Sequence, residues 1–121
     1  MSRRKGDQIE QQAERYLQQQ GLKPLQRNFK ARGGEIDLIM HDKTALVFIE
    51  VRFRRSNLYG SAAETVDYRK QQRIINSAMQ FLQQHPKYCN LACRFDVVAC
   101  QPDNSTHGLG IEWFKNAFET S

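Results

Sequence analysis

Apolar residues recur at helical spacing in two stretches of the chain. The first, residues 7–20, places four of them on one face: Ile9, Ala13, Tyr16 and Leu17. Gly21 ends this predicted helix, because glycine is the usual residue just past a helix C-terminus. The second stretch predicts a long helix over residues 62–84, with Pro86 just beyond its end. Its apolar face consists of Ile74, Ile75, Ala78, Phe81 and Leu82.

Shorter apolar runs between and after these helices predict strands. The expected strands cover residues 24–31, 35–40, 44–54 and 91–100, and a short last strand or turn covers residues 111–114. In the second of them, Ile36, Leu38 and Met40 should share one face. Phe118 should dock the end of the chain. The order α-β-β-β-α-β-β predicts an α/β fold, a mixed β-sheet flanked by helices.

The third expected strand changes character along its length. One face is apolar throughout, whereas the other begins with Leu46 and Phe48 and continues with Glu50, Arg52 and Arg54. A strand that is apolar on both faces at its start belongs in the centre of a sheet. Its charged end then needs a reason, because buried charges are costly unless they are paired or bound to metal.

The hairpin before this strand supplies that reason. If its loop is the pair Asp42 and Lys43, Glu35 faces Glu50, and Asp37 becomes a diagonal neighbour of Glu50 on the same side of the sheet. Such carboxylates repel each other unless a cation lies between them, and Mg²⁺ prefers hard oxygen ligands. A loop longer by one residue would put the two on opposite faces.

A simpler interpretation needs no metal. Arg52 follows Glu50 on the same face and can neutralise it in an ordinary ion pair, while Asp37 accepts hydrogen bonds from a turn. Spacing alone leaves both interpretations open.

Length and composition favour one domain. The 121 residues, 40% hydrophobic and 26% charged, make a globular chain able to bury about two thirds of its surface. We expect a single domain over residues 1–121, with residues 1–6 frayed. The chain has no apolar run long enough for a bilayer, no signal-peptide pattern after its basic start, and an odd number of cysteines, three. A cytoplasmic protein with reduced thiols is therefore expected.

Charge points to an anionic partner. Lys and Arg number 18 against 13 Asp and Glu, a net charge of +5, and nucleic acid is the commonest anion for a soluble basic domain. The basic residues expected near the charged strand end are Arg52, Arg54, Arg55, Arg69, Lys70 and Arg73. They would contact backbone phosphates without reading sequence. The alternative is a protein that is merely basic.

Two segments resemble the D-x(n)-E-x-K core of restriction-endonuclease-like nucleases: residues 33–39 (GGEIDLI) and 46–52 (LVFIEVR). Nearly the whole chain resembles the YraN family of small predicted endonucleases, which is similar in turn to archaeal Holliday-junction resolvases. The supporting positions are Glu10, Ala13 and Leu17, Arg27 to Phe29, Gly60, Glu64 and Val66, Lys70 and Arg73, Arg94 to Val98, and Asn116 to Phe118.

The resemblance implies a restriction-endonuclease-like sheet and a role for each matching residue. Asp37 and Glu50 would be metal ligands assisted by the Val51 carbonyl, and Glu10 would contribute through the metal's waters. Arg52 stands where the motif has its catalytic lysine, and arginine supplies charge but exchanges no proton. Lys70 is the other lysine in reach, either as a substitute or as a phosphate contact.

The sequence thus predicts an endonuclease dependent on Mg²⁺ or Mn²⁺ that acts on DNA, at branched or single-stranded-containing structures. The leading alternative is a nucleic-acid-binding or DNA-repair accessory module that kept the fold without efficient chemistry. A third is a basic interaction protein with no nucleic-acid role. A homodimer is compatible with the nuclease prediction, because small nucleases often cut two strands.

Overall fold

A computed structural model describes residues 3–54, 66–103 and 108–119. The elements in chain order are α1 (Arg3–Gln19), β1 (Lys23–Ala31), β2 (Gly34–Asp42), β3 (Ala45–Phe53), α2 (Tyr68–Gln84), the short 3₁₀ helix η2 (Pro86–Tyr88), β4 (Ala92–Asp103) and β5 (Gly108–Phe118). This order confirms the predicted α-β-β-β-α-β-β arrangement. Within the described ranges, no helix is long and apolar enough to cross a membrane.

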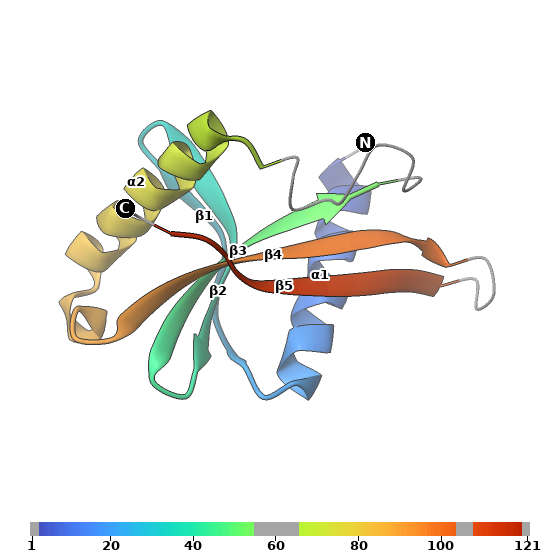
Figure 1. Ribbon diagram of the computed structural model, residues 1–121, viewed down its shortest axis with the longest axis horizontal. Helices are drawn as coiled ribbons and strands as arrows, with labels where there is room; N and C mark the ends of the chain where they lie inside the picture. The colour runs from blue at the N-terminus through green and yellow to red at the C-terminus, as the bar shows by residue number, and fades with distance from the viewer. Residues whose placement is uncertain (1–2, 55–65, 104–107, 120–121) are drawn as a thin grey trace.

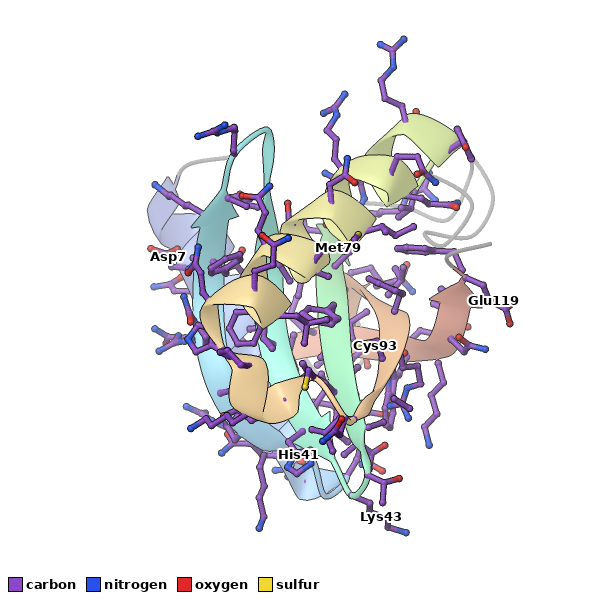
Figure 2. All side chains as sticks on the ribbon, turned by 90° about the vertical axis from the view of Figure 1, so that its left-hand side faces the viewer. Asp7, His41, Lys43, Met79, Cys93 and Glu119 are labelled. Atoms are coloured by element: carbon purple, nitrogen blue, oxygen red, sulfur yellow. The ribbon has the colours of Figure 1, made fainter. Side chains whose placement is uncertain are left out.

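The strands form one five-stranded sheet in the order β1-β2-β3-β4-β5. Only the β3–β4 pair is parallel, and the chain crosses between these strands through α2. Helix α2 covers one face of the sheet and α1 covers the other (Figure 1). Figure 2 views the α2 side, where Met79 lies on the outer, exposed surface of that helix. Each helix encloses its own apolar cluster against the sheet, so the central strands β2, β3 and β4 are buried on both faces, as predicted for β3.

Helix α2 and strand β5 differ most in length from the sequence prediction. Helix α2 begins at Tyr68, because the Asp67 side chain accepts a hydrogen bond of 2.8 Å from the Lys70 N–H and caps the helix. Residues 62–65 of the predicted helix lie outside the described residues. Strand β5 is eleven residues long rather than short, since it pairs with β4 from Asp103 to Phe95. Phe118 is buried and stacks on Phe95 with ring centroids 5.2 Å apart, as expected for the docked chain end.

The β2–β3 hairpin differs in register. Asp42 pairs with Ala45, so its loop is Lys43 and Thr44 instead of Asp42 and Lys43. Lys43 adopts a positive φ of 55° to make this tight turn. The register therefore moves by two positions, and because side chains alternate with a period of two, Asp37 and Glu50 stay on one face, as predicted.

In β1 and β2, the alternation of side chains between the two faces of the sheet reverses near Asn28, which has a positive φ of 55°. Leu38 and Met40 pack in the α1 cluster, whereas Ile36 packs in the α2 cluster. The prediction that these three residues share one face is wrong for Ile36. Asp37 lies at this reversal, so the strand end is accessible to residues from both helices.

Asp96 on β4 connects β4 to β5 through hydrogen bonds, and its side chain is fully buried. Its carboxylate accepts hydrogen bonds from Arg94 Nε at 3.0 Å, Trp113 Nε1 at 2.9 Å and the Asn116 N–H at 2.9 Å. Arg94 also bonds Asp42 at 3.0 Å. The β4–β5 register shifts beside Asp96, and Asn116 has a positive φ of 53° there. The buried charge is thus neutralised and holds an irregular strand pair together.

We predict that Asp96→Asn lowers the free energy of unfolding by about 3 kcal/mol, because it removes one member of a buried ion pair. Urea unfolding followed by circular dichroism measures this. The control is Glu112→Gln on exposed β5, expected within about 0.5 kcal/mol of wild type. Equal stability of the two variants would show that the network contributes nothing.

Candidate active site

Asp37 and Glu50 lie side by side at the ends of β2 and β3. The last registered pair before them is Leu38 with Ile49, so one further step makes them cross-strand partners. They are direct rather than diagonal neighbours, and Glu35 does not face Glu50. Both side chains are buried, with exposed fractions of 8% for Asp37 and 6% for Glu50. The Val51 N–H donates to Asp37 Oδ2 at 2.9 Å and fixes the orientation of that carboxylate.

The proximity of these acids changes the protonation of Asp37. Burial first, and the charge of Glu50 second, raise the pKa of Asp37 from 3.8 to about 8, while the hydrogen bond from Val51 opposes the shift. Glu10 and Glu35 add smaller repulsions. At neutral pH without a bound cation, Asp37 therefore keeps its proton. A divalent cation would reverse this, because its charge favours the ionised carboxylate.

Glu10 reaches the same region from α1, as the resemblance implies. Burial raises its pKa, repulsion from Asp7 and Glu35 adds to the shift, and hydrogen bonding to the Asn28 side chain opposes it. Its Oε1 atom is buried and has no hydrogen-bond partner among the residues that the structure describes. A buried oxygen of this kind is costly unless a further donor or cation is present.

Two cations neutralise Glu50. The Lys70 Nζ lies 3.1 Å from Glu50 Oε1, and the Arg52 Nη1 lies 3.7 Å from the same oxygen. The Glu50–Arg52 ion pair of the simpler interpretation therefore exists, but Lys70 makes the closer contact. Lys70 is half-buried and comes from the first turn of α2, so it reaches the acids from the α2 side of the sheet.

A cleft of about 380 Å³ opens onto these groups. The β1–β2 turn forms one wall and the start of α2 forms the other. Its lining consists of Lys30, Ala31, Gly33, Gly34, Glu35, Asp37, Glu50, Lys70, Arg73 and Ile74. The acids of β2 and β3 thus share a cleft with cations from both walls.

The other predicted basic residues are distributed differently. Arg69 is exposed on α2, next to the cleft residues Lys70 and Arg73. Arg54 is half-buried beyond β3, where its N–H donates to the Cys100 carbonyl, and Arg55 lies outside the described residues.

Sequence reasoning missed Lys30 and Asn28 as residues of this region. Lys30 is opposite Glu35 in the register of β1 and β2, and counting outward from the Gly33–Gly34 turn would have found it. Asn28 was one of the positions of the family resemblance but had no role assigned to it, because its positive φ and its proximity to Glu10 depend on how α1 packs on the sheet.

The donor set suits a hard divalent cation that keeps some of its waters. Asp37 and Glu50 offer two carboxylates, and Mg²⁺ commonly binds through one or two carboxylates together with substrate phosphates. The described residues contain no group of three or more His, Cys, Asp or Glu side chains arranged to hold a metal ion. Asp37 and Glu50 alone would leave most positions around such an ion to water or other ligands.

Known proteins resemble the chain over nearly its whole length. Residues 9–100 match the model of "Uncharacterised protein family UPF0102". A UPF0102 protein of Saccharophagus degradans is 54% identical over 113 residues, which cover 93% of this chain and 91% of that protein. A UPF0102 protein of Klebsiella pneumoniae is 49% identical over 119 residues, which cover 98% of this chain and 88% of that protein. The matched region includes the cleft and its acids.

We predict that Asp37→Asn stabilises the metal-free protein increasingly as pH rises from 5 to 8. The folded carboxyl keeps its proton up to a pKa of about 8, whereas the unfolded one loses it near 3.8. Wild type consequently loses stability across this window, and asparagine has no proton to lose. Melting temperatures in EDTA at both pH values measure the effect, expected to be about 4 °C or more at pH 8. Glu112→Gln is the control, and a difference between Asp37→Asn and wild type that does not change with pH would contradict the prediction.

Proposed function

We propose that this chain, which belongs to the UPF0102 (YraN) family, is a metal-dependent endonuclease that hydrolyses DNA phosphodiesters. The observation that carries the proposal is the buried Asp37–Glu50 pair in a cleft whose lining also includes Lys30, Lys70 and Arg73. Opposed carboxylates on a sheet destabilise it. Their position beside Lys70 and Arg73 fits a site for both a metal ion and a phosphate.

Asp37 and Glu50 would hold Mg²⁺ or Mn²⁺, with the Val51 carbonyl and water-linked Glu10 in support. When bound, such an ion lowers the pKa of water and stabilises charge developing on a phosphodiester. The N–H of Val51 keeps Asp37 oriented through the 2.9 Å hydrogen bond. The unpaired Oε1 of Glu10 is available to accept a hydrogen bond from water.

Lys70 takes the part that the nuclease motif gives to a lysine after the glutamate. Its ammonium is the closer of the two cations on Glu50 and lines the cleft. A lysine can both stabilise negative charge and exchange a proton, whereas Arg52 in the motif position supplies charge alone. The fixed charge of Arg52 would then orient Glu50 and stabilise the phosphate.

DNA is the proposed partner and the cytoplasm the proposed compartment. Arg69 and Arg73 continue the cationic surface beyond Lys70, with Arg54 and Arg55 as further predicted phosphate contacts. Such contacts bind any sequence, so the selection would be for DNA structure, at branched or single-stranded-containing sites. A homodimer remains compatible with this proposal.

One observation favours a second candidate, a nucleic-acid-binding accessory module without cleavage. Lys70 and Arg52 already neutralise Glu50, and the raised pKa of Asp37 keeps that residue neutral at pH 7. The site is therefore electrically compensated without a metal ion. Metal-dependent cleavage separates the candidates, because only the nuclease requires it.

We predict that Mn²⁺ or Mg²⁺ raises the melting temperature of wild type, by the equivalent of about 2.7 kcal/mol at a hundredfold excess over the dissociation constant. Glu50→Gln should abolish both this shift and the Mn²⁺-dependent cleavage of DNA. Glu112→Gln, exposed and remote on β5, should retain both. A full metal response in Glu50→Gln would place the ion elsewhere, and metal binding without cleavage of four-way, flap or linear DNA would favour the accessory module.

We predict that Lys70→Met lowers cleavage by about two orders of magnitude, the effect of losing one preorganised donor. Arg52→Lys should retain or increase cleavage, since it keeps the charge and restores the motif lysine, and Arg52→Ala should lose most of it. Single-turnover rates on one DNA substrate with Mn²⁺ measure all three, after thermal melting has shown that each variant is folded. If Lys70→Met cleaves like wild type, Lys70 has no catalytic part.

A further inference from the structure

We propose that the cleft between the β1–β2 turn and α2 takes an unpaired DNA strand, held at its backbone by Lys30 and Arg73, and does not admit continuous duplex. This inference rests on the proposed function and names the substrate class of the same site. It depends on the depth of the acids, the free charges of the cleft and the rigidity of its walls.

The reactive groups lie too deep for a phosphate on the outside of a duplex. Asp37 and Glu50 line the cleft, yet each is more than nine-tenths buried. The cleft volume of about 380 Å³ is at the lower end of the roughly 300–1,000 Å³ of small-ligand pockets. It can hold a group the size of one nucleotide. A double helix is far wider and would remain on the rim, whereas a single strand can bend its backbone into the cleft.

Two of the cations that line the cleft are uncompensated. Lys70 is paired with Glu50, but neither Lys30 nor Arg73 has an ion-pair partner among the described residues. Both are exposed, and they come from opposite walls, Lys30 from β1 and Arg73 from α2. Cations on two sides of a narrow cleft can contact the phosphates that flank the one at the acids.

The walls are fixed to each other, so the cleft cannot widen easily. A Cβ atom at Gly34 would lie 2.9 Å from Ser77 Oγ and 3.4 Å from the Arg73 carbonyl oxygen, which shows how closely β2 packs on α2. Farther along, the Arg32 N–H donates to Gln80 Oε1 at 2.9 Å, and Gln80 Nε2 donates to the Arg32 carbonyl at 3.0 Å. Opening the cleft for a duplex would break these contacts.

The test compares binding of a fluorescent single-stranded oligonucleotide with binding of the same sequence as a blunt duplex, by anisotropy in Ca²⁺ so that cleavage does not intervene. We expect wild type to bind the single strand at least about tenfold more tightly. Lys30→Ala/Arg73→Ala should weaken single-strand binding by about tenfold or more. It should also flatten the plot of log affinity against log salt by about 1.4, the contribution of two phosphate contacts on a single strand.

The matched control is Lys23→Ala/Arg15→Ala, which also removes one lysine and one arginine charge but away from the cleft. Lys23 lies at the other end of β1, and Arg15 lies on exposed α1 across the sheet. Its affinity should stay within about twofold of wild type. Duplex binding as tight as single-strand binding, or equal losses in the two double variants, would overturn the inference.

Cleavage by wild type in Mn²⁺ keeps this inference separate from the proposed function. Duplex cut as fast as single-stranded or flap DNA would overturn the inference and leave the nuclease proposal standing. Preferred binding of the single strand through Lys30 and Arg73, without cleavage of any substrate, would support the inference and overturn the nuclease proposal.

Discussion

The burial of Asp37 opposite Glu50 is the interaction on which the rest of the site depends. Two adjacent carboxylates in a sheet cannot both be ionised cheaply, and the protein responds in two ways. Burial and the charge of Glu50 raise the pKa of Asp37 to about 8, while Lys70 and Arg52 neutralise Glu50. The charged residues around the pair therefore balance one another, and a bound divalent cation would shift that balance by favouring the ionised form of Asp37.

The fold brings charges from both of its outer layers to this point. A regular strand would direct Asp37 and its alternate neighbours toward one helix only. The reversal near Asn28 moves Ile36 into the α2 cluster while Leu38 stays in the α1 cluster. Glu10 can thus influence Asp37 from α1 while Lys70 reaches Glu50 from α2. The irregular backbone is what makes one site out of residues separated by the sheet.

Periodicity was sufficient for the element order and for the faces of β3, because alternation and helical spacing are local properties. The wrong hairpin loop did not matter for the shared face of Asp37 and Glu50, since the register moved by an even number of positions. Three features could not be predicted in this way. The reversal at Asn28, the 3.1 Å contact of Lys70 and the cleft wall at Gly34 all depend on how helices pack against the sheet. Pairwise tertiary contacts of this kind leave no periodic signal in the sequence.

A comparison of the two buried aspartates supports a ligand at Asp37. Asp96 accepts hydrogen bonds from Arg94, Trp113 and the Asn116 N–H, so the fold can fully satisfy a carboxylate that it buries. Asp37 accepts a hydrogen bond from the Val51 N–H and faces Glu50 instead of a cation. Stability alone would favour an apolar or amide side chain there, because a buried acid beside a second acid is costly. The cost is understandable if a cation and a phosphate complete the site during function, which is the role that the proposed nuclease gives to this pair.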